Sequence, residues 1–389
     1  MFWPLMKSTI TDKDKSKLIK FIKESDRFTN GEKVIEFEKK WSNWLGINHS
    51  LFVSSGSTAN FLLLSSIKEK YNLNNDDKVI VPACTWMTNV APVIQIGFKP
   101  IFCDINLQNY SFDKEYLLKI KNKENDIKIV FVTHLLGIPA DIEYYKNIFP
   151  NAIFLEDVCE SHGSMIGNKK TGTFSNGSTF SFYYGHHMSC IEGGMVCTND
   201  SELYYLMKSK RSHGYAKELD KNLFEKIRNE YNDMNPDFLF YTDGYNFRNT
   251  ELGAVLGLSQ LENLDKNNIK RKNNFKKFIN IIKKYDIFEI PSEEGNSSFC
   301  FPFIIKDINF KNKLLKIFKN NGIETRPIVG GNLVRQPFLK KLNINNDFHN
   351  ADYLNDNGFY IGNNHLIKNN EIKELSYIID IAYKEFVNG

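Results

Sequence analysis

The sequence predicts an α/β fold, with a mostly parallel sheet in a large domain and a smaller C-terminal α/β domain. Three observations predict it. Short apolar runs with β-branched residues recur through the first two-thirds of the chain, and segments with helical periodicity separate them. This strand–helix alternation is typical of a parallel sheet covered on both faces. A long amphipathic pattern after residue 248, followed by a further strand and helices, indicates the second unit.

The expected strands of the large unit each end at a polar or turn residue. In chain order they are 78–82, 100–104, 127–133 and 152–156, with a short apolar run before them at 51–53 and helices expected at 58–69 and 114–121. The carboxyl ends of parallel strands meet at one edge of a sheet, and polar residues there tend to line the ligand crevice. The residues that follow these runs are therefore the first candidates for a site.

The smaller unit begins after a long or broken amphipathic helix expected at 249–285. A strand is expected at 298–305, a helix at 310–320 and a terminal helix at 371–386. We place the domain boundary within the long helix. Residues 1–250 then form the large domain, and residues 251–389 form the connecting helix and the small C-terminal domain.

Composition and charge exclude several classes of protein. Of the 389 residues, 42% are hydrophobic and 14% aromatic, which is ample for a large core. A net charge of only +4 argues against a nucleic-acid partner. The six cysteines have neither zinc-site nor disulfide-framework spacing, so no metal is expected. We see no signal peptide and no apolar run of membrane-spanning length, and therefore expect a cytoplasmic protein without a membrane partner.

Two short segments could hold a flat, phosphorylated ligand. Gly56, Ser57 and Thr58 open a helix after an apolar run, where the free N–H groups and partial positive charge suit a phosphate. An ordinary helix cap is the alternative explanation. Trp86 follows the run 78–82 and could stack on a flat ring, although a core tryptophan is the commoner explanation.

Two further segments carry acid–base chemistry. Asp157 follows the run 152–156, and its carboxylate could keep a pyridine nitrogen protonated, while Glu160 could exchange protons or hydrogen bonds nearby. Ser181 could donate to a phosphate. His186, with an ordinary pKa of about 6.5, suits proton transfer near neutrality. Each signal is weak alone, because a polar strand end or surface histidines would look the same.

The order of these segments resembles that of the DegT/DnrJ/EryC1/StrS sugar aminotransferases, which are fold-type I enzymes of pyridoxal 5′-phosphate (PLP). The resemblance spans nearly the whole chain and includes the motifs at 79–82, 97–104, 134–141, 172–174, 192–196, 211–215, 244–248 and 322–327. It implies the fold-type I PLP aminotransferase-like fold, with cofactor binding in the large domain.

The resemblance also implies roles for particular residues. Asp157 would pair with the pyridine nitrogen, Trp86 would stack on the ring and Glu160 would lie near it. Gly56, Ser57, Thr58 and Ser181 would hold the phosphate. Asn246 would reach the phosphate of the cofactor bound to the other subunit, so a homodimer with shared active sites is implied. His213, Arg248 and Arg326 match positions near the sugar or the amino donor.

One position departs from the aminotransferases. Their lysine, which carries the cofactor as a Schiff base, is replaced by His186, which cannot form that bond but can move protons. The branch of the family that the chain most resembles, the GDP-4-keto-6-deoxymannose 3-dehydratases, has histidine here. This implies a C-3 dehydratase that uses non-covalently bound PLP and pyridoxamine 5′-phosphate (PMP). Its substrates would be L-glutamate and a 4-keto-6-deoxy nucleotide sugar, with GDP favoured, for deoxysugars of lipopolysaccharide O-antigen or capsule.

Several alternatives stay open. An ordinary aminotransferase could use Lys169 or Lys170, although both fall in an expected turn. The iron–sulfur sugar 3-dehydrases also use histidine, but their close Cys-x-Cys pair is absent. A catalytically silent regulator is a third possibility. The nucleotide could be CDP, dTDP or UDP, and the sugar a heptose. His187 has no assigned role, and the segment 216–241 could form a substrate or dimer loop or a packed surface.

Overall fold

The centre of the structure, a computed structural model that describes residues 2–342, 344 and 347–388, is a seven-stranded sheet ordered β1-β9-β8-β5-β4-β2-β3. Its strands are β1 (His49–Val53), β2 (Lys78–Pro82), β3 (Lys99–Cys103), β4 (Ile127–Thr133), β5 (Ile153–Asp157), β8 (Gly177–Ser181) and β9 (Gly194–Thr198). The pairs among β3, β2, β4, β5 and β8 are parallel, whereas β9 runs antiparallel to both of its neighbours. The predicted mostly parallel sheet is confirmed.

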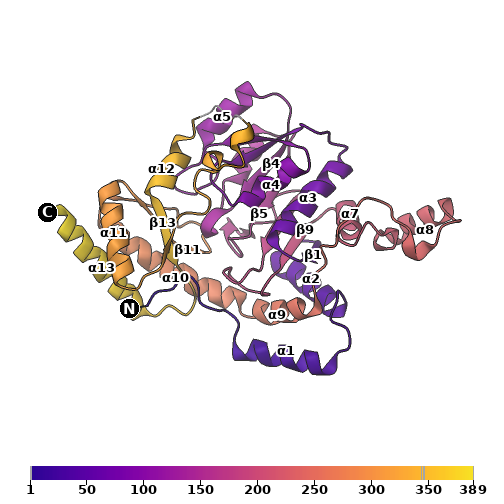
Figure 1. Cartoon of the computed structure of the whole chain (residues 1–389), viewed down its shortest axis with the longest axis horizontal. Coiled ribbons are helices and arrows are strands. Elements are labelled where there is room, and N and C mark those ends of the chain that lie inside the picture. The colour runs from indigo at the N-terminus through magenta and orange to yellow at the C-terminus, as the bar shows by residue number, and fades with distance from the viewer. Residues whose placement is uncertain (1, 343, 345–346, 389) are drawn as a thin grey trace.

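Helices cover both faces of this sheet (Figure 1). They are α2 (Glu32–Leu45), α3 (Gly56–Lys70), α4 (Ala91–Gln95), α5 (Lys114–Lys123), α6 (Ile142–Ile148) and α7 (Ser201–Arg211), whereas α1 (Asp12–Glu24) packs against the later helix α9 (Glu251–Leu261). Alternate residues of β4 enter different cores: Ile129 and Phe131 pack in the cluster that contains α3, and Val130 and Val132 in the cluster that contains α5 and α6. Both faces are therefore apolar, as a buried parallel sheet requires.

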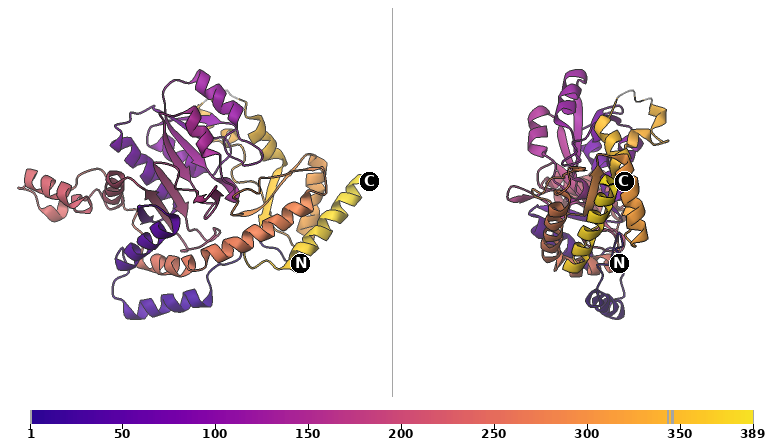
Figure 2. Two further views of the ribbon diagram at one scale, coloured as in Figure 1. Left: turned by 180° about the vertical axis from the view of Figure 1, so that it is seen from behind. Right: turned by 90° about the vertical axis from the view of Figure 1, so that its left-hand side faces the viewer.

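The long helical pattern is broken into α9 (Glu251–Leu261) and α10 (Leu264–Ile282). Seen from behind, the two run along one side of the large sheet toward the small unit (Figure 2). The small unit has a four-stranded antiparallel sheet ordered β10-β11-β13-β12. Its elements are β10 (Phe288–Glu289), β11 (Cys300–Ile305), α11 (Ile308–Asn320), β12 (Thr325–Arg326), α12 (His349–Asn357), β13 (Gly358–Gly362) and α13 (Asn369–Val387).

Strand β11 joins the cores of the two units. Phe301 and Phe303 point into the aromatic core of the small unit, whereas Cys300 and Ile304 belong to the core that contains α3. The strand expected at 298–305 and the helices expected at 310–320 and 371–386 are present with shifted ends. The domain division at residue 250 stays a prediction. Within the described residues, no helix is long and apolar enough to cross a membrane.

An N-terminal strap, residues 2–7, lies along the small unit. Trp3 is 3% exposed, and its indole N–H donates to the Gly362 carbonyl at 2.8 Å. The Trp3 backbone pairs in parallel with Ile323. Further along the strap, Met6 lies so close to Gly185 that a Cβ on this glycine would be 2.2 Å from its sulfur. The strap therefore connects the small unit to the loop after β8.

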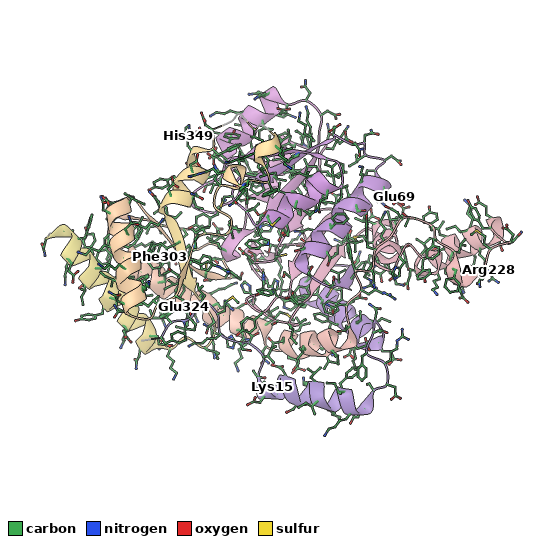
Figure 3. All side chains as sticks on the ribbon, viewed as in Figure 1. Lys15, Glu69, Arg228, Phe303, Glu324 and His349 are labelled. Carbon is green, nitrogen blue, oxygen red and sulfur yellow. The ribbon has the colours of Figure 1, made fainter. Side chains whose placement is uncertain are left out.

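A helical arm, residues 216–241, projects from the large unit. It contains α8 (Lys221–Glu230) and a small apolar cluster of its own, which includes Leu219 and Ile227. Figure 3 shows Arg228 far out on the arm and Glu69 near its base. Several aromatic side chains on the arm are exposed, among them Phe238 and Phe240. The segment is thus neither a flat surface loop nor part of the main core.

Candidate active site

A cavity of about 400 Å³ opens at the carboxyl ends of β1, β4, β5 and β8, where the large sheet meets the small unit. The predicted site residues that line it are Gly56, Ser57, Trp86, Asp157, Glu160, Ser181, His186 and Arg326. Thr58, Asn246, His213 and Arg248 are not among its lining residues. The cavity therefore lies at the carboxyl ends of the strands, where a ligand crevice was expected, and most of the candidate residues line it.

The start of α3 forms one wall. Ser55 accepts the Thr58 N–H at 3.1 Å, and the Thr58 hydroxyl accepts the Ser55 N–H at 2.9 Å, so Ser55 caps the helix and Thr58 completes the capping box. A Cβ on Gly56 would lie 2.7 Å from the Ser181 Cβ and 3.0 Å from the Cys159 sulfur. Only glycine permits this close approach. The first N–H groups of a helix lack intrahelical partners, so this cradle fits a phosphate.

Asp157 forms the floor. It is 4% exposed, and one oxygen accepts from the amides of Asn60 at 2.8 Å and Asn89 at 2.9 Å. The other oxygen accepts the Cys159 N–H at 2.9 Å. These donors fix the carboxylate but are neutral, so they leave its negative charge uncompensated. The arrangement fits a protonated pyridine nitrogen, which would supply the missing positive charge.

Trp86 and Glu160 lie on other sides of the cavity. Trp86 is 53% exposed, which rules out a core position and leaves its ring face available for stacking. Burial raises the pKa of Glu160 to about 7, although the Leu136 N–H donates to its carboxylate at 3.0 Å. Leu136 has a left-handed φ of 55°, which is strained for leucine and aims its N–H at Glu160.

His186 lies on the loop after β8. Its Nδ1 is hydrogen-bonded to the Cys159 carbonyl oxygen, which can only accept, so the neutral ring carries its proton on Nδ1. Nε2 is then the free base. Burial lowers the pKa of His186 to about 4, against the Cys159 hydrogen bond, which acts to raise it. His186 is therefore a neutral proton acceptor at pH 7.

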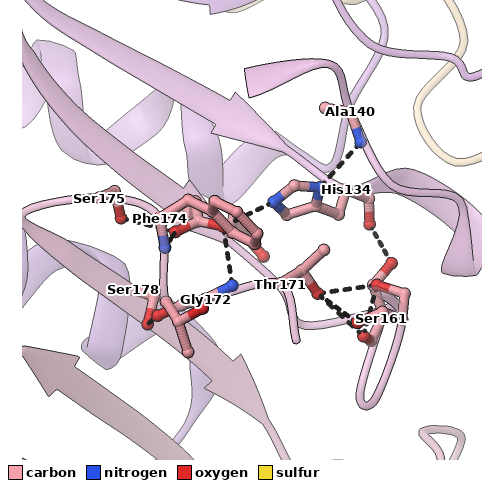
Figure 4. A network of polar contacts seen from close by, with 12 residues as sticks. His134, Ala140, Ser161, Thr171, Gly172, Phe174, Ser175 and Ser178 are labelled. Atoms are coloured by element: carbon pink, nitrogen blue, oxygen red, sulfur yellow. Dashed lines mark hydrogen bonds and ion pairs between the residues drawn. The ribbon is translucent and has the colours of Figure 1, made fainter. Parts of the chain in front are cut away.

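A buried network holds the turn beneath the site (Figure 4). His134 accepts the Ala140 N–H on Nδ1 at 2.9 Å and therefore donates from Nε2 to Glu156 at 3.0 Å. Glu156 also accepts the N–H groups of Gly172 at 2.7 Å and Phe174 at 2.9 Å. The network fixes the end of β5 immediately before Asp157.

The remaining candidates form a separate exposed cluster. Arg248 donates to His213 at 3.1 Å and to the Asn246 side chain at 3.2 Å. The Arg248 backbone forms a bridge with Val53, at the end of β1. The cluster is thus adjacent to the start of the cavity wall but does not line the cavity of its own chain. The roles predicted for these three residues stay predictions.

Lysine is absent from the described residues that line the cavity. Lys169 and Lys170 form β7 (Lys169–Lys170) of a small hairpin with β6 (Met165–Ile166), in place of the expected turn. The Lys170 ammonium donates to the Trp44 carbonyl at 2.7 Å. A displaced lysine is therefore not available to this site. In the described part of the chain, no group of three or more His, Cys, Asp or Glu could hold a metal ion.

Several residues of the site could not be identified from sequence. Asn60 and Asn89 lie on a helix and a 3-10 turn without a pattern that distinguishes them from other amides. The carbonyl group that orients His186 belongs to the main chain of Cys159, so no pattern of side chains in the sequence could have indicated it. His134 could have been identified as a candidate, because it directly follows β4, but its contact with Glu156 is apparent only from the structure.

A mostly parallel sheet, a small antiparallel unit and a cavity suited to a phosphorylated pyridine define an enzyme of the PLP-dependent aminotransferase class. The model of the DegT/DnrJ/EryC1/StrS aminotransferase family matches residues 9–379, and the chain belongs to this family.

Its relatives include the GDP-4-keto-6-deoxy-D-mannose 3-dehydratase of Escherichia coli O55:H7, 33% identical over 97% of this chain and 99% of that protein. The structure of the E. coli 3-dehydratase with bound hydrated PLP has a TM-score of 0.89 and 32% identity, over 97% of this chain and 99% of that one. A 3-dehydratase structure with a trapped PLP–glutamate geminal diamine has a TM-score of 0.88 and 31% identity, over 97% and 100% of the two chains.

Proposed function

We propose that this protein is a PLP/PMP-dependent, glutamate-requiring C-3 dehydratase that acts on a GDP-linked 4-keto-6-deoxy sugar in deoxysugar biosynthesis. The observation that carries the proposal is a histidine in the cavity, His186, beside an intact set of residues that fit the cofactor. The relatives with this activity in their names align over nearly the whole chain. One of the similar structures contains a PLP–glutamate adduct, which supports glutamate as the amino donor.

The cofactor would be held without a covalent bond. The Asp157 carboxylate would accept the pyridine N–H, and Trp86 would stack on the ring. The N–H groups of Gly56 and Ser57 and the hydroxyl of Ser181 would bind the phosphate. When bound, the cofactor supplies a conjugated ring that withdraws electrons from the attached sugar carbons. Because no described lysine of the cavity would bind the cofactor covalently, these non-covalent contacts would provide all of its binding free energy.

His186 would serve as base and then as acid. Its neutral Nε2 would accept the proton that the bound cofactor makes acidic, since the proton on Nδ1 is already donated to the Cys159 carbonyl. The resulting imidazolium is a strong acid, because its pKa of about 4 disfavours the charged form, and it protonates the 3-hydroxyl as that group leaves. In the net reaction the sugar loses its C3 oxygen, and glutamate becomes 2-oxoglutarate and ammonia, which balances without added water.

We further propose a cytoplasmic homodimer with shared active sites. Asn246 would bind the phosphate of the partner's cofactor, and His213 and Arg248 would approach the partner's sugar or amino donor. Arg326 would act in its own chain. Support comes from the exposed, mutually hydrogen-bonded cluster of Asn246, His213 and Arg248, which lies outside its own cavity. The deoxysugar would serve lipopolysaccharide O-antigen or capsule synthesis.

The test is an assay of the purified protein with PLP, glutamate and a panel of 4-keto-6-deoxy sugars linked to GDP, CDP, dTDP or UDP. We expect a 3-deoxy-4-keto product, with ammonia and 2-oxoglutarate formed in equal amounts, and fastest turnover with GDP. A 4-amino sugar without ammonia would identify an aminotransferase instead. Fastest turnover with another nucleotide would correct the GDP assignment and leave the dehydratase assignment intact.

A further inference from the structure

A buried arginine with no acidic partner among the described residues lies near His186. Arg271, on α10, is 2% exposed. Its Nη1 donates to the main-chain carbonyls of Ser298, Phe299 and Asn363, and its Nε has no partner in the described part of the chain. Burial lowers the pKa of Arg271 to about 10, so the guanidinium is still charged at pH 7. A buried charge held only by carbonyl oxygens is costly, which calls for an explanation.

The charge of Arg271 acts to lower the pKa of four histidines, of which three, His162, His186 and His187, lie close together. The rings of His162 and His186 are stacked with centroids 6.2 Å apart, and those of His162 and His187 are 5.3 Å apart. His162 has no hydrogen-bond partner on either ring nitrogen among the described residues, and His187 has one, the Ser297 carbonyl at 3.3 Å. Burial, and then the charge of Arg271, lowers the pKa of His187. These rings are therefore neutral, and none of them supplies a competing positive charge.

Arg271 also lies near the loop that carries His186. Arg271 and His186 line one small cavity of about 10 Å³, which the N-terminal strap closes through Met6 and Lys7. The carbonyls that Arg271 binds belong to the segment that carries Phe299, whose ring is 5.5 Å from the His186 ring. The guanidinium thus acts on His186 in two ways, through its charge and through the position of Phe299.

We propose that Arg271 is a positioning residue for His186, whose fixed charge adds to burial in disfavouring the imidazolium and whose hydrogen bonds hold Phe299 against the ring. The proposal rests on the proposed role of His186 as the base. The proposed role explains why the described residues give Arg271 no acidic partner, since a buried carboxylate at this point would neutralise Arg271 and favour the imidazolium.

Other titratable groups face His186 from each element packed against it. They are Asp157, Cys159, Glu160 and His162 after β5, Tyr183 and His187 in its own loop, Lys7 in the strap, and Cys300, Arg326 and Tyr360 in the small unit. Asp157 acts in the opposite direction to Arg271 and favours the charged ring. Arg271 opposes it with a charge that cannot be discharged near neutral pH.

The test measures the protonation of His186 directly, in the enzyme without substrate. Histidine ring signals are titrated by NMR, and His186→Asn identifies the signal of interest. In the wild-type enzyme we expect the His186 pKa well below its ordinary value of 6.5. Arg271→Gln keeps an amide donor for the carbonyls but removes the charge, and we expect it to raise the pKa of His186 by about one unit. Arg271→Lys keeps the charge and should leave the pKa near the wild-type value.

Lys270→Met is the matched control, because it removes an exposed charge from the neighbouring position of the same helix and should leave His186 unchanged. A folded Arg271→Gln protein with an unshifted His186 would reduce Arg271 to a structural role. If the variants do not fold, a wild-type His186 that titrates near 6.5 would still overturn the proposal. The titration needs no sugar substrate, so failure of the dehydratase assignment would leave its result readable.

Discussion

The Nδ1 atom of His186 donates to the main-chain carbonyl oxygen of Cys159, and Nε2 is consequently the proton acceptor of the ring. Cys159 is two residues after Asp157, and its N–H donates to the Asp157 carboxylate. One short turn therefore orients both the proposed base and the proposed partner of the cofactor ring. Movement of this turn would disturb both groups together.

His186→Lys should suppress dehydration by about 100-fold or more, because the proton shuttle is lost. The new amine lies in the cavity and should bind the cofactor covalently. Absorbance spectra and the mass of the protein after borohydride reduction would report this bond. His186→Asn is the matched control, expected to lose activity without any covalent link. Full 3-dehydratase activity in His186→Lys would refute the role given to His186.

Asp157→Asn should reduce turnover by about 100-fold, because a neutral amide cannot stabilise a protonated pyridine nitrogen. The reaction would be followed as ammonia release at saturating cofactor. Asp141→Asn is the control: Asp141 pairs with Lys114 at 2.6 Å on the partly exposed side of α5 and α6, away from the cavity. Wild-type turnover in Asp157→Asn would contradict the pyridine assignment.

Glu156→Gln should lower the free energy of unfolding at pH 7 by about 1–3 kcal/mol, since a buried amide cannot accept all the hydrogen bonds that the carboxylate accepts. Burial alone would raise the pKa of Glu156, but hydrogen bonds from His134, Gly172 and Ser175 hold it below its ordinary 4.5. A lowered folded-state pKa stabilises the fold above pH 4.5, and this contribution is lost as the pH falls through the folded value.

Urea titrations at several pH values would test this. The difference between wild type and Glu156→Gln should be constant from pH 7 to about 5 and shrink below 4.5. Glu225→Gln, at an exposed pair with Arg228, should show little difference at any pH. A wild-type advantage that grew as the pH fell would show that the Glu156 pKa is raised instead.

Phe303→Ala should destabilise the small unit by about 3–5 kcal/mol. Phe303, labelled in Figure 3, is fully buried and its ring stacks on Phe359 at 5.0 Å. Calorimetry should show a lower melting temperature. Phe338→Ala, at a side chain that is 40% exposed, is the control and should change the melting temperature little. Equal effects of the two substitutions would show that this core does not depend on Phe303.

The sequence predicted those parts of the molecule that depend on local pattern. Strand β2 was predicted with its observed ends, because the apolar residues Val79–Val81 stand between Lys78 and Pro82 after a turn. Strand β9 was not predicted, since Gly194–Thr198 begins inside a motif that was assigned by resemblance, and its reversed direction depends on its neighbours β1 and β8. Local pattern specifies that a strand exists, but not its direction.

The candidate site divides in the same way. Gly56 begins α3, Asp157 ends β5 and His186 lies in the loop after β8, so their positions could be predicted from the sequence. Arg271 was not, because it lies among the lysines and asparagines of α10 and looks like part of a solvated face. Its burial results from packing against residues 298–299 and 363, which are remote in sequence.

The N-terminal strap imposes an order on the maturation of the enzyme. Trp3 is synthesised well before its partner, because the carbonyl that its indole binds lies 359 positions later in the chain. Domains generally fold as units during synthesis, N-terminal first, but this contact has to wait for the small unit. Since Met6 of the strap lines the cavity, a nascent chain cannot assemble a closed site. The site is therefore complete only after the small unit has been synthesised and has folded.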